Sequence, residues 1–185
     1  MKILIIGGSK SGKSMLAQTL AQKLQSGRLF YIATMNPRDD EDLNRIKRHI
    51  AERDGCGFET IEQPKHINEC MGQLTGKDTI LIDSLTTLLA NEMFAVNEIN
   101  TEAYLSISEQ LEQLCNAVCN AVIVSDFIFS NAIIYEPLTQ SYLRGLSVIN
   151  RNIAMNCDIV IEMNNSNCIC HKGKDLFGAL NEKTI

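Results

Sequence analysis

Short apolar runs alternate with longer amphipathic segments along this chain. The apolar runs contain little polar alternation and predict buried strands at 2–6, 29–33, 58–61, 79–82, 121–124 and 159–163. Segments with apolar residues three and four apart predict helices at 13–25, 39–53, 85–96, 102–121 and 138–155. Because buried strands separated by helices are typical of parallel sheets, we expect an α/β fold with a mostly parallel central sheet covered by helices on both faces.

The length of 185 residues suits one α/β domain with a sizeable core. No internal repeat, low-complexity tract or linker interrupts the pattern, so residues 1–185 are interpreted as a single domain. Residues 164–185 are polar and support no further prediction.

The amino-acid composition excludes several classes of function. The net charge is −5, which argues against a nucleic-acid partner, since that partner normally requires a basic surface. No run approaches the roughly 18 apolar residues of a membrane span, and the first apolar run lacks the features of a secretory leader. The seven cysteines are interpreted as reduced thiols. We expect a cytoplasmic protein without a membrane span.

The cysteines are not assigned to a metal site. Cys168 and Cys170 with His171 form a strand-like alternation, whereas a tetrahedral zinc site needs a second pair of ligands.

The strongest motif lies between the first predicted strand and helix, and it reads Gly7-Gly8-Ser9-Lys10-Ser11-Gly12-Lys13-Ser14. Glycines allow successive backbone N–H groups to turn toward phosphate oxygens, and the helix that follows adds its positive end. This is the pattern of a phosphate-binding loop, or P-loop. In such a loop Lys13 contacts the β- and γ-phosphates and is a candidate catalytic residue, and the Ser14 hydroxyl binds Mg²⁺. The motif predicts a P-loop NTPase-type three-layer fold that binds GTP or ATP.

A P-loop site also needs a carboxylate at the end of a nearby strand to hold the metal or its water. Asp83 directly follows an apolar strand, so Ser14 and Asp83 are the candidate Mg²⁺ ligands. The base-reading Asn-Lys-x-Asp motif of signalling GTPases is absent from the sequence.

Further motifs occur in a fixed order over residues 1–95. They are Tyr31-Ile-Ala-Thr34, Asp40-Glu41, Arg45-Ile46-Lys-Arg-His49, Thr60-Ile-Glu62 and Asp83-Ser84-Leu85-Thr86. Together with the loop they resemble the bifunctional adenosylcobinamide kinase and adenosylcobinamide-phosphate guanylyltransferase family of cobalamin biosynthesis, with Ser84 where that family has cysteine.

The resemblance implies two reactions. One phosphorylates the aminopropanol hydroxyl of adenosylcobinamide with a nucleoside triphosphate. In the other, GTP guanylylates a histidine, here His49, and GMP then passes to adenosylcobinamide phosphate to give adenosyl-GDP-cobinamide. Imidazole suits that role because its ordinary pKa, about 6.5, leaves it largely neutral at pH 7.

The same resemblance implies further nucleotide-binding positions and an assembly. The positions are Ala33, Thr34, Met35, Ile50, Ala51, Glu52, Arg53, Glu62 and Asp83. The family also implies a homo-oligomer, specifically a homotrimer. The nucleotide that serves the kinase step, ATP or GTP, is left open.

The resemblance weakens over residues 125–151. The family pattern has a glutamate and two glycines after the strand that ends at Val124, whereas this chain has Phe127 and no glycine in that loop. The alternatives are therefore a divergent paralogue with only one of the two activities, a P-loop kinase of another small alcohol, or a non-catalytic GTP-binding subunit.

Overall fold

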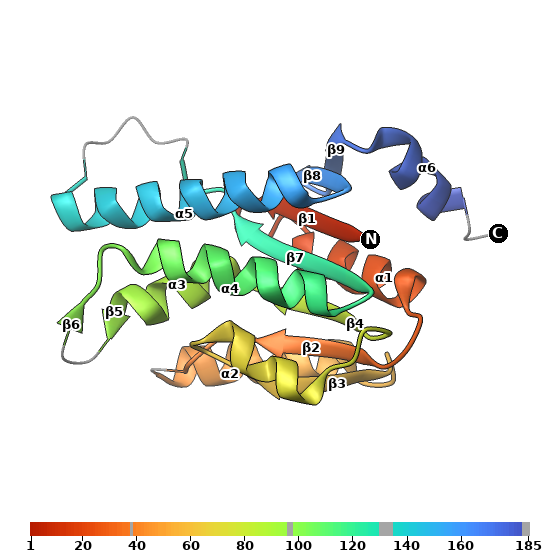
Figure 1. The fold of residues 1–185 in the computed structure, drawn as a ribbon, viewed down its shortest axis with the longest axis horizontal. Coiled ribbons are helices and arrows are strands. Elements are labelled where there is room, and N and C mark those ends of the chain that lie inside the picture. Colours follow the sequence, from red (N-terminus) through yellow and green to blue (C-terminus); the bar gives the residue numbers. More distant parts are fainter. Residues whose placement is uncertain (38, 96–97, 130–134, 183–185) are drawn as a thin grey trace.

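In a computed structural model, the chain forms a seven-stranded sheet with helices on both faces (Figure 1). The structure describes residues 1–37, 39–95, 98–129 and 135–182, without the side chains of Arg45, His49 and Glu52.

The strands of the main sheet follow the order β3-β2-β4-β7-β1-β8-β9, and all neighbours pair in parallel except β8 and β9, which are antiparallel. Their bounds are β1 Lys2–Gly7, β2 Leu29–Ala33, β3 Phe58–Glu62, β4 Thr79–Asp83, β7 Asn120–Asp126, β8 Ile159–Asn164 and β9 Asn167–Lys172. A separate two-stranded sheet pairs β5 Phe94–Ala95 with β6 Glu98–Ile99.

The helices lie mostly between the strands in sequence. Their bounds are α1 Lys13–Leu24, α2 Asp40–Arg53, α3 Leu85–Met93, α4 Ala103–Ala117, α5 Pro137–Asn156 and α6 Lys174–Glu182, with a 3₁₀ helix η1 at Ile67–Gln73. Asp39 caps α2, since its side chain accepts a hydrogen bond from the Asp42 backbone N–H.

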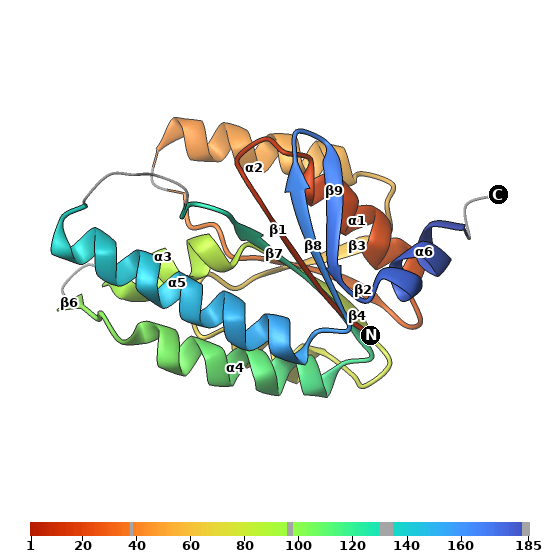
Figure 2. The ribbon, with the colours of Figure 1, turned by 90° about the horizontal axis from the view of Figure 1, so that it is seen from above.

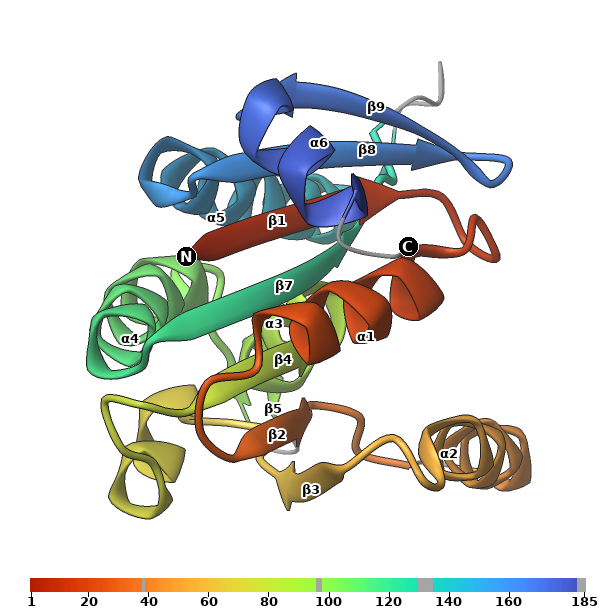
Figure 3. The same ribbon diagram turned by 90° about the vertical axis from the view of Figure 1, so that its right-hand side faces the viewer.

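Successive residues of each strand point to opposite faces of the sheet, which creates two apolar layers. On β1, Ile3 and Ile5 pack with Leu20 of α1 and Phe177 of α6, whereas Leu4 packs into the layer beneath α3, α4 and α5. Figure 3 shows α1 and α6 on one face, the other three helices behind the sheet, and α2 beyond the carboxyl ends of the strands. The expected three-layer α/β fold is confirmed.

Several expected boundaries were wrong. The helix expected over 85–96 ends at Met93, where β5 begins, and residues 96 and 97 lie outside the described part. The helix expected over 102–121 ends at Ala117, because Asn120 and Ala121 already pair with β4 and β1. Residues 164–185, where the sequence indicates only a strand-like alternation around Cys168 and Cys170, contribute β9 and α6.

Within the described ranges, no helix is both long enough and apolar enough to cross a membrane.

Asp78 joins three segments at the amino end of the sheet. Its carboxylate accepts hydrogen bonds from the backbone N–H groups of Arg28 (3.0 Å) and Thr75 (2.7 Å) and from Arg28 Nη2 (3.1 Å). Its backbone carbonyl accepts from Cys119 and Asn120 at the start of β7. Burial by itself raises the pKa of Asp78, but the hydrogen bonds from Thr75 and Arg28 outweigh burial, so the pKa is lowered.

We therefore expect Asp78→Asn to lower the free energy of unfolding by about 1–3 kcal/mol at pH 7, because buried donors lose a charged acceptor. A carboxylate with a lowered pKa stabilises the fold above its unfolded pKa, about 3.9, and this contribution is lost as the pH falls through the folded pKa. The difference between the two proteins should thus shrink in acid. Urea unfolding from pH 7 to pH 3 measures it, with Asp175→Asn, at an exposed residue of α6, as control. Equal stabilities at pH 7 would contradict the role of Asp78.

Candidate functional site

The glycine loop connects the end of β1 to the start of α1. A Cβ on Gly7 would lie 2.5 Å from the carbonyl oxygen of Met163 on the neighbouring strand β8, and Gly12 has a φ of 91°. Neither position accepts another residue without distortion. Gly12 is the N-cap of α1 and offers no side-chain acceptor, so the first N–H groups of this helix have no side-chain cap. Such a helix end is an anion-binding site.

Lys13 lies within the loop rather than in solvent. Its side chain is 8% exposed, and its ammonium donates to the carbonyl oxygen of Gly8 at 2.7 Å. The same Nζ lies 2.9 Å from Asp126 Oδ1 at the end of β7. The Lys13 charge is therefore placed between the loop backbone and a second strand end.

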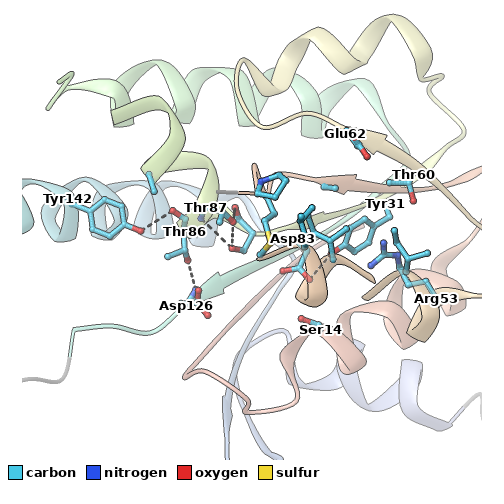
Figure 4. A pocket seen from close by; sticks show the side chains of 18 residues that line it. Ser14, Tyr31, Arg53, Thr60, Glu62, Asp83, Thr86, Thr87, Asp126 and Tyr142 are labelled. Atoms are coloured by element: carbon cyan, nitrogen blue, oxygen red, sulfur yellow. Dashed lines mark hydrogen bonds between the residues drawn. The ribbon is translucent and has the colours of Figure 1, made fainter. Parts of the chain in front are cut away.

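A pocket of about 450 Å³ opens beside the loop at the carboxyl ends of the strands (Figure 4). Ser14 and Asp83 lie in its middle, Arg53, Thr60 and Glu62 at one end, and Thr86, Asp126 and Tyr142 at the other. The expected site residues that line it are Ser14, Ala33, Met35, Ile50, Arg53, Glu62 and Asp83. Residues from β2, α2, β3 and β4 thus meet the loop in one cavity.

At the α2 end, a buried cation lies over an aromatic ring. The guanidinium carbon of Arg53 is 3.5 Å from the centroid of the Tyr31 ring, a cation–π contact. Arg53 is buried, and its Nη1 has no hydrogen-bond partner within the described part of the chain. Tyr31 in turn donates its hydroxyl to Asp83 Oδ2 at 3.1 Å. A buried donor without a partner suits an anionic ligand, because such a donor is otherwise costly.

Beneath the pocket, a hydroxyl network holds the ends of β2 and β4 together. Thr34 Oγ1 donates to the Ser84 carbonyl oxygen (2.9 Å) and accepts from the Ser84 N–H (2.8 Å). Thr87 lies 3.0 Å from the Thr34 hydroxyl and 2.9 Å from the Ser84 hydroxyl. Ser84 caps α3. Thr34 is thus fully buried and supports the pocket from below rather than lining it.

At the opposite end, Asp126 is fixed by its neighbours. Its backbone N–H donates to Thr86 Oγ1 at 2.9 Å, and the Tyr142 hydroxyl donates to the Thr86 carbonyl oxygen at 2.9 Å. Burial and, to a smaller extent, the Asp126 carboxylate raise the pKa of Tyr142 to about 12. The Tyr142 phenol therefore stays protonated near neutral pH and acts as a donor.

Some expected site residues lie elsewhere. Ala51 is exposed on α2 and does not line the pocket. His49 and Glu52 lie on the same helix, and their side chains lie outside the described part. His49 is one helical turn from both Ile46 and Arg53, which line the pocket. The expected site omitted Tyr31, Thr86, Asp126 and Tyr142, although Asp126 follows an apolar strand just as Asp83 does.

The loop at the start of α1, the parallel sheet and the acidic residue at the end of β4 define a P-loop nucleotide-binding fold. A solved ATPase domain has this fold, with a TM-score of 0.55 at 14% identity over 94% of this chain and 77% of that one. A prototypical ATPase from the type III secretion system of pathogenic bacteria is similar, with a TM-score of 0.50 at 15% identity over 88% of this chain and 51% of that one.

The match to a protein-family model identifies the family within this class of fold. The chain belongs to the cobinamide kinase / cobinamide phosphate guanyltransferase family, whose model matches residues 3–166.

Curated relatives match part of the chain. The bifunctional adenosylcobalamin biosynthesis protein CobU of Escherichia coli (strain K12) is 34% identical over 95 residues, which cover 51% of each chain. The protein of the same name in Salmonella typhimurium is 35% identical over 99 residues, 52% of each chain. CobP of Pseudomonas aeruginosa is 38% identical over 93 residues, 49% of this chain and 52% of its own. The matched segment thus spans about half the length of these relatives.

The loop geometry predicts different effects of alanine substitution at two adjacent glycines, Gly7 and Gly8. Gly7→Ala should unfold the loop or lower the melting temperature and abolish nucleotide binding, because the new Cβ meets backbone. Gly8→Ala is the matched control for folding, since a Cβ there meets nothing within 4 Å. Thermal unfolding of both variants and nucleotide titration of Gly7→Ala check this. Equal behaviour of the two variants would contradict the loop geometry.

Proposed function

We propose that this chain phosphorylates adenosylcobinamide with a nucleoside triphosphate and then transfers GMP from GTP, through a guanylyl-histidine at His49, to adenosylcobinamide phosphate. The proposal rests chiefly on one arrangement: the P-loop Ser14 shares a pocket with residues of α2, the helix that carries His49, and Lys13 contacts Asp126, which lines the same pocket. Membership of the family supports it.

The pocket suggests how a nucleotide lies. The phosphates bind the loop N–H groups and Lys13, as in other P-loops. At the α2 end, Arg53 Nη1, which has no partner among the described residues, suits a phosphate oxygen, and the Glu62 carboxylate suits the donor edge of guanine or a ribose hydroxyl. In this orientation, the phosphates of the nucleotide extend from α2 toward the loop.

A divalent cation fits the residues between the two ends. Ser14 offers a hydroxyl and Asp83 a carboxylate, both hard oxygen donors of the kind Mg²⁺ binds. When bound, Mg²⁺ would neutralise phosphate charge. The hydrogen bond from Tyr31 to Asp83 Oδ2 fixes the orientation of this carboxylate.

In the guanylyl half-reaction, a neutral His49 imidazole attacks the α-phosphorus and pyrophosphate leaves. The phosphate of adenosylcobinamide phosphate then attacks the guanylyl phosphorus and frees the histidine. Dividing one displacement into two lets a single site serve two substrates in turn. We further propose that residues 1–185 form one domain that works in the cytoplasm as a homo-oligomer, a trimer by resemblance.

Guanylylation is tested directly by the covalent intermediate. Incubation with Mg²⁺ and α-labelled GTP should produce an acid-labile, GMP-sized mass increase on the denatured protein. We expect no such increase in His49→Ala, because the nucleophile is absent, and an unchanged yield in His171→Ala, whose histidine pairs with Glu162 on β8. An adduct that persists in His49→Ala would overturn the assignment of His49.

Nucleotide binding is tested through the loop lysine. Lys13→Ala should weaken GTP binding by about ten- to a hundredfold, because hydrogen bonds to charged groups contribute roughly 1.5–3 kcal/mol. Lys77→Ala, in an exposed turn, supplies a control with the same loss of charge. Isothermal titration with GTP measures both. An unchanged affinity of Lys13→Ala for GTP would show that the nucleotide does not bind at the loop.

A further inference from the structure

A second carboxylate lies beside the loop lysine, on the side of the pocket away from α2. Asp126 Oδ1 is 2.9 Å from Lys13 Nζ, and the Asp126 side chain is 29% exposed toward the pocket that also contains Ser14 and Asp83 (Figure 4). β1 and β7 pair in parallel with Gly7 opposite Asp126, and the Phe127 N–H donates to the Gly7 carbonyl oxygen at 2.8 Å. The start of the loop and Asp126 are thus held in register.

This contact places Asp126 relative to a bound nucleotide. A P-loop lysine reaches the β- and γ-phosphates, so a carboxylate in contact with its ammonium lies within a few ångströms of the γ-phosphate. The α2 end holds the groups suited to base, sugar and α-phosphate. An alcohol that attacks the γ-phosphorus in line with the leaving group must therefore approach from the end that Thr86, Asp126 and Tyr142 form.

We propose that Asp126 is the catalytic base of the kinase reaction and that the end of the pocket around Thr86 and Tyr142 receives the acceptor alcohol. This inference rests on the proposed function. The alcohol oxygen forms a bond to the γ-phosphorus while the bond between that phosphorus and the β–γ bridging oxygen breaks. The bridging electron pair leaves with the nucleoside diphosphate, and the hydroxyl proton passes to the Asp126 carboxylate.

Asp83 is less suited to this role. Its Oδ2 already accepts the Tyr31 hydroxyl, and Tyr31 lies beneath Arg53 at the nucleotide end. Asp126, in contrast, is anchored through its backbone: its N–H is held by Thr86, which Tyr142 supports in turn. Its side chain therefore projects from a fixed point toward Lys13.

Asp126 is also poorly suited to hold the divalent cation. Its Oδ1 already lies against the Lys13 ammonium, and a second cation at the same oxygen would be repelled. A base needs a carboxylate beside the reacting group, and the contact with Lys13 places Asp126 there.

The test compares Asp126→Asn with Asp126→Glu, and with Asp175→Asn on exposed α6 as control. Asp126→Asn should lower kcat for phosphorylation of adenosylcobinamide about a hundredfold or more, the usual contribution of a positioned base. Its affinity for ADP and GTP should stay equal or increase, since a negative charge beside the phosphates is removed. Asp126→Glu should recover part of kcat, because it restores a carboxylate. Asp175→Asn should match the wild type.

Two outcomes would overturn the inference. A kcat of Asp126→Asn within threefold of wild type excludes a base. Weakened nucleotide affinity together with equal losses in phosphorylation and guanylyl-histidine formation makes Asp126 a residue that only positions Lys13. Failure of the proposed function is distinguishable, because the wild type itself would then form neither cobinamide phosphate nor the guanylyl adduct.

Discussion

The pairing of β1 between β7 and β8 is the constraint on which the site depends. Parallel register sets Gly7 opposite both Asp126 and Met163, so the loop leaves the sheet at a point closely surrounded by neighbouring strand ends. Since β7 also pairs with β4, Asp83 reaches the same edge one strand further along. Ligands of open α/β sheets bind outside the carboxyl ends of the strands for this reason. Figure 2 shows α2 on that same side of the sheet.

The floor and the α2 end of the pocket are built differently. Around Thr34, Ser84 and Thr87, short hydroxyl contacts tie β2, β4 and α3 into one polar layer. The α2 end depends instead on the stacking of Arg53 on Tyr31, which leaves a guanidinium nitrogen without a partner in the described chain. In the proposed reactions, a firm floor suits the phosphates and the attacking alcohol. A buried cation with spare hydrogen-bonding capacity suits a group that changes charge during the proposed transfer of GMP.

Local patterns predicted the strands and the loop because each depends on neighbouring residues: apolar runs for β1, β2, β4 and β8, and the spacing of Gly7, Gly12 and Lys13. The elements that were missed depend on distant residues. β9, of which the sequence indicates only a strand-like alternation, is largely exposed and exists because it pairs with β8. The helix α4 stops early because Asn120 is drawn into the sheet, where its side chain bonds Leu24 and Thr79. Tertiary pairing overrides local periodicity in both cases.

Asp126 illustrates the same limit within the site. The departure of residues 125–151 from the family pattern suggested the loss of a carboxylate from this strand end, and residues 130–134 of that region lie outside the described part. The structure places the Asp126 carboxylate against Lys13, one position before the family's glutamate. Side chains alternate along a strand, so a shift of one residue would normally reverse the direction of a side chain. Asp126 is the last residue of β7, and its side chain reaches Lys13 from that strand end. A carboxylate at this position therefore contacts the phosphate loop, although it lies one residue away from the position in the family pattern.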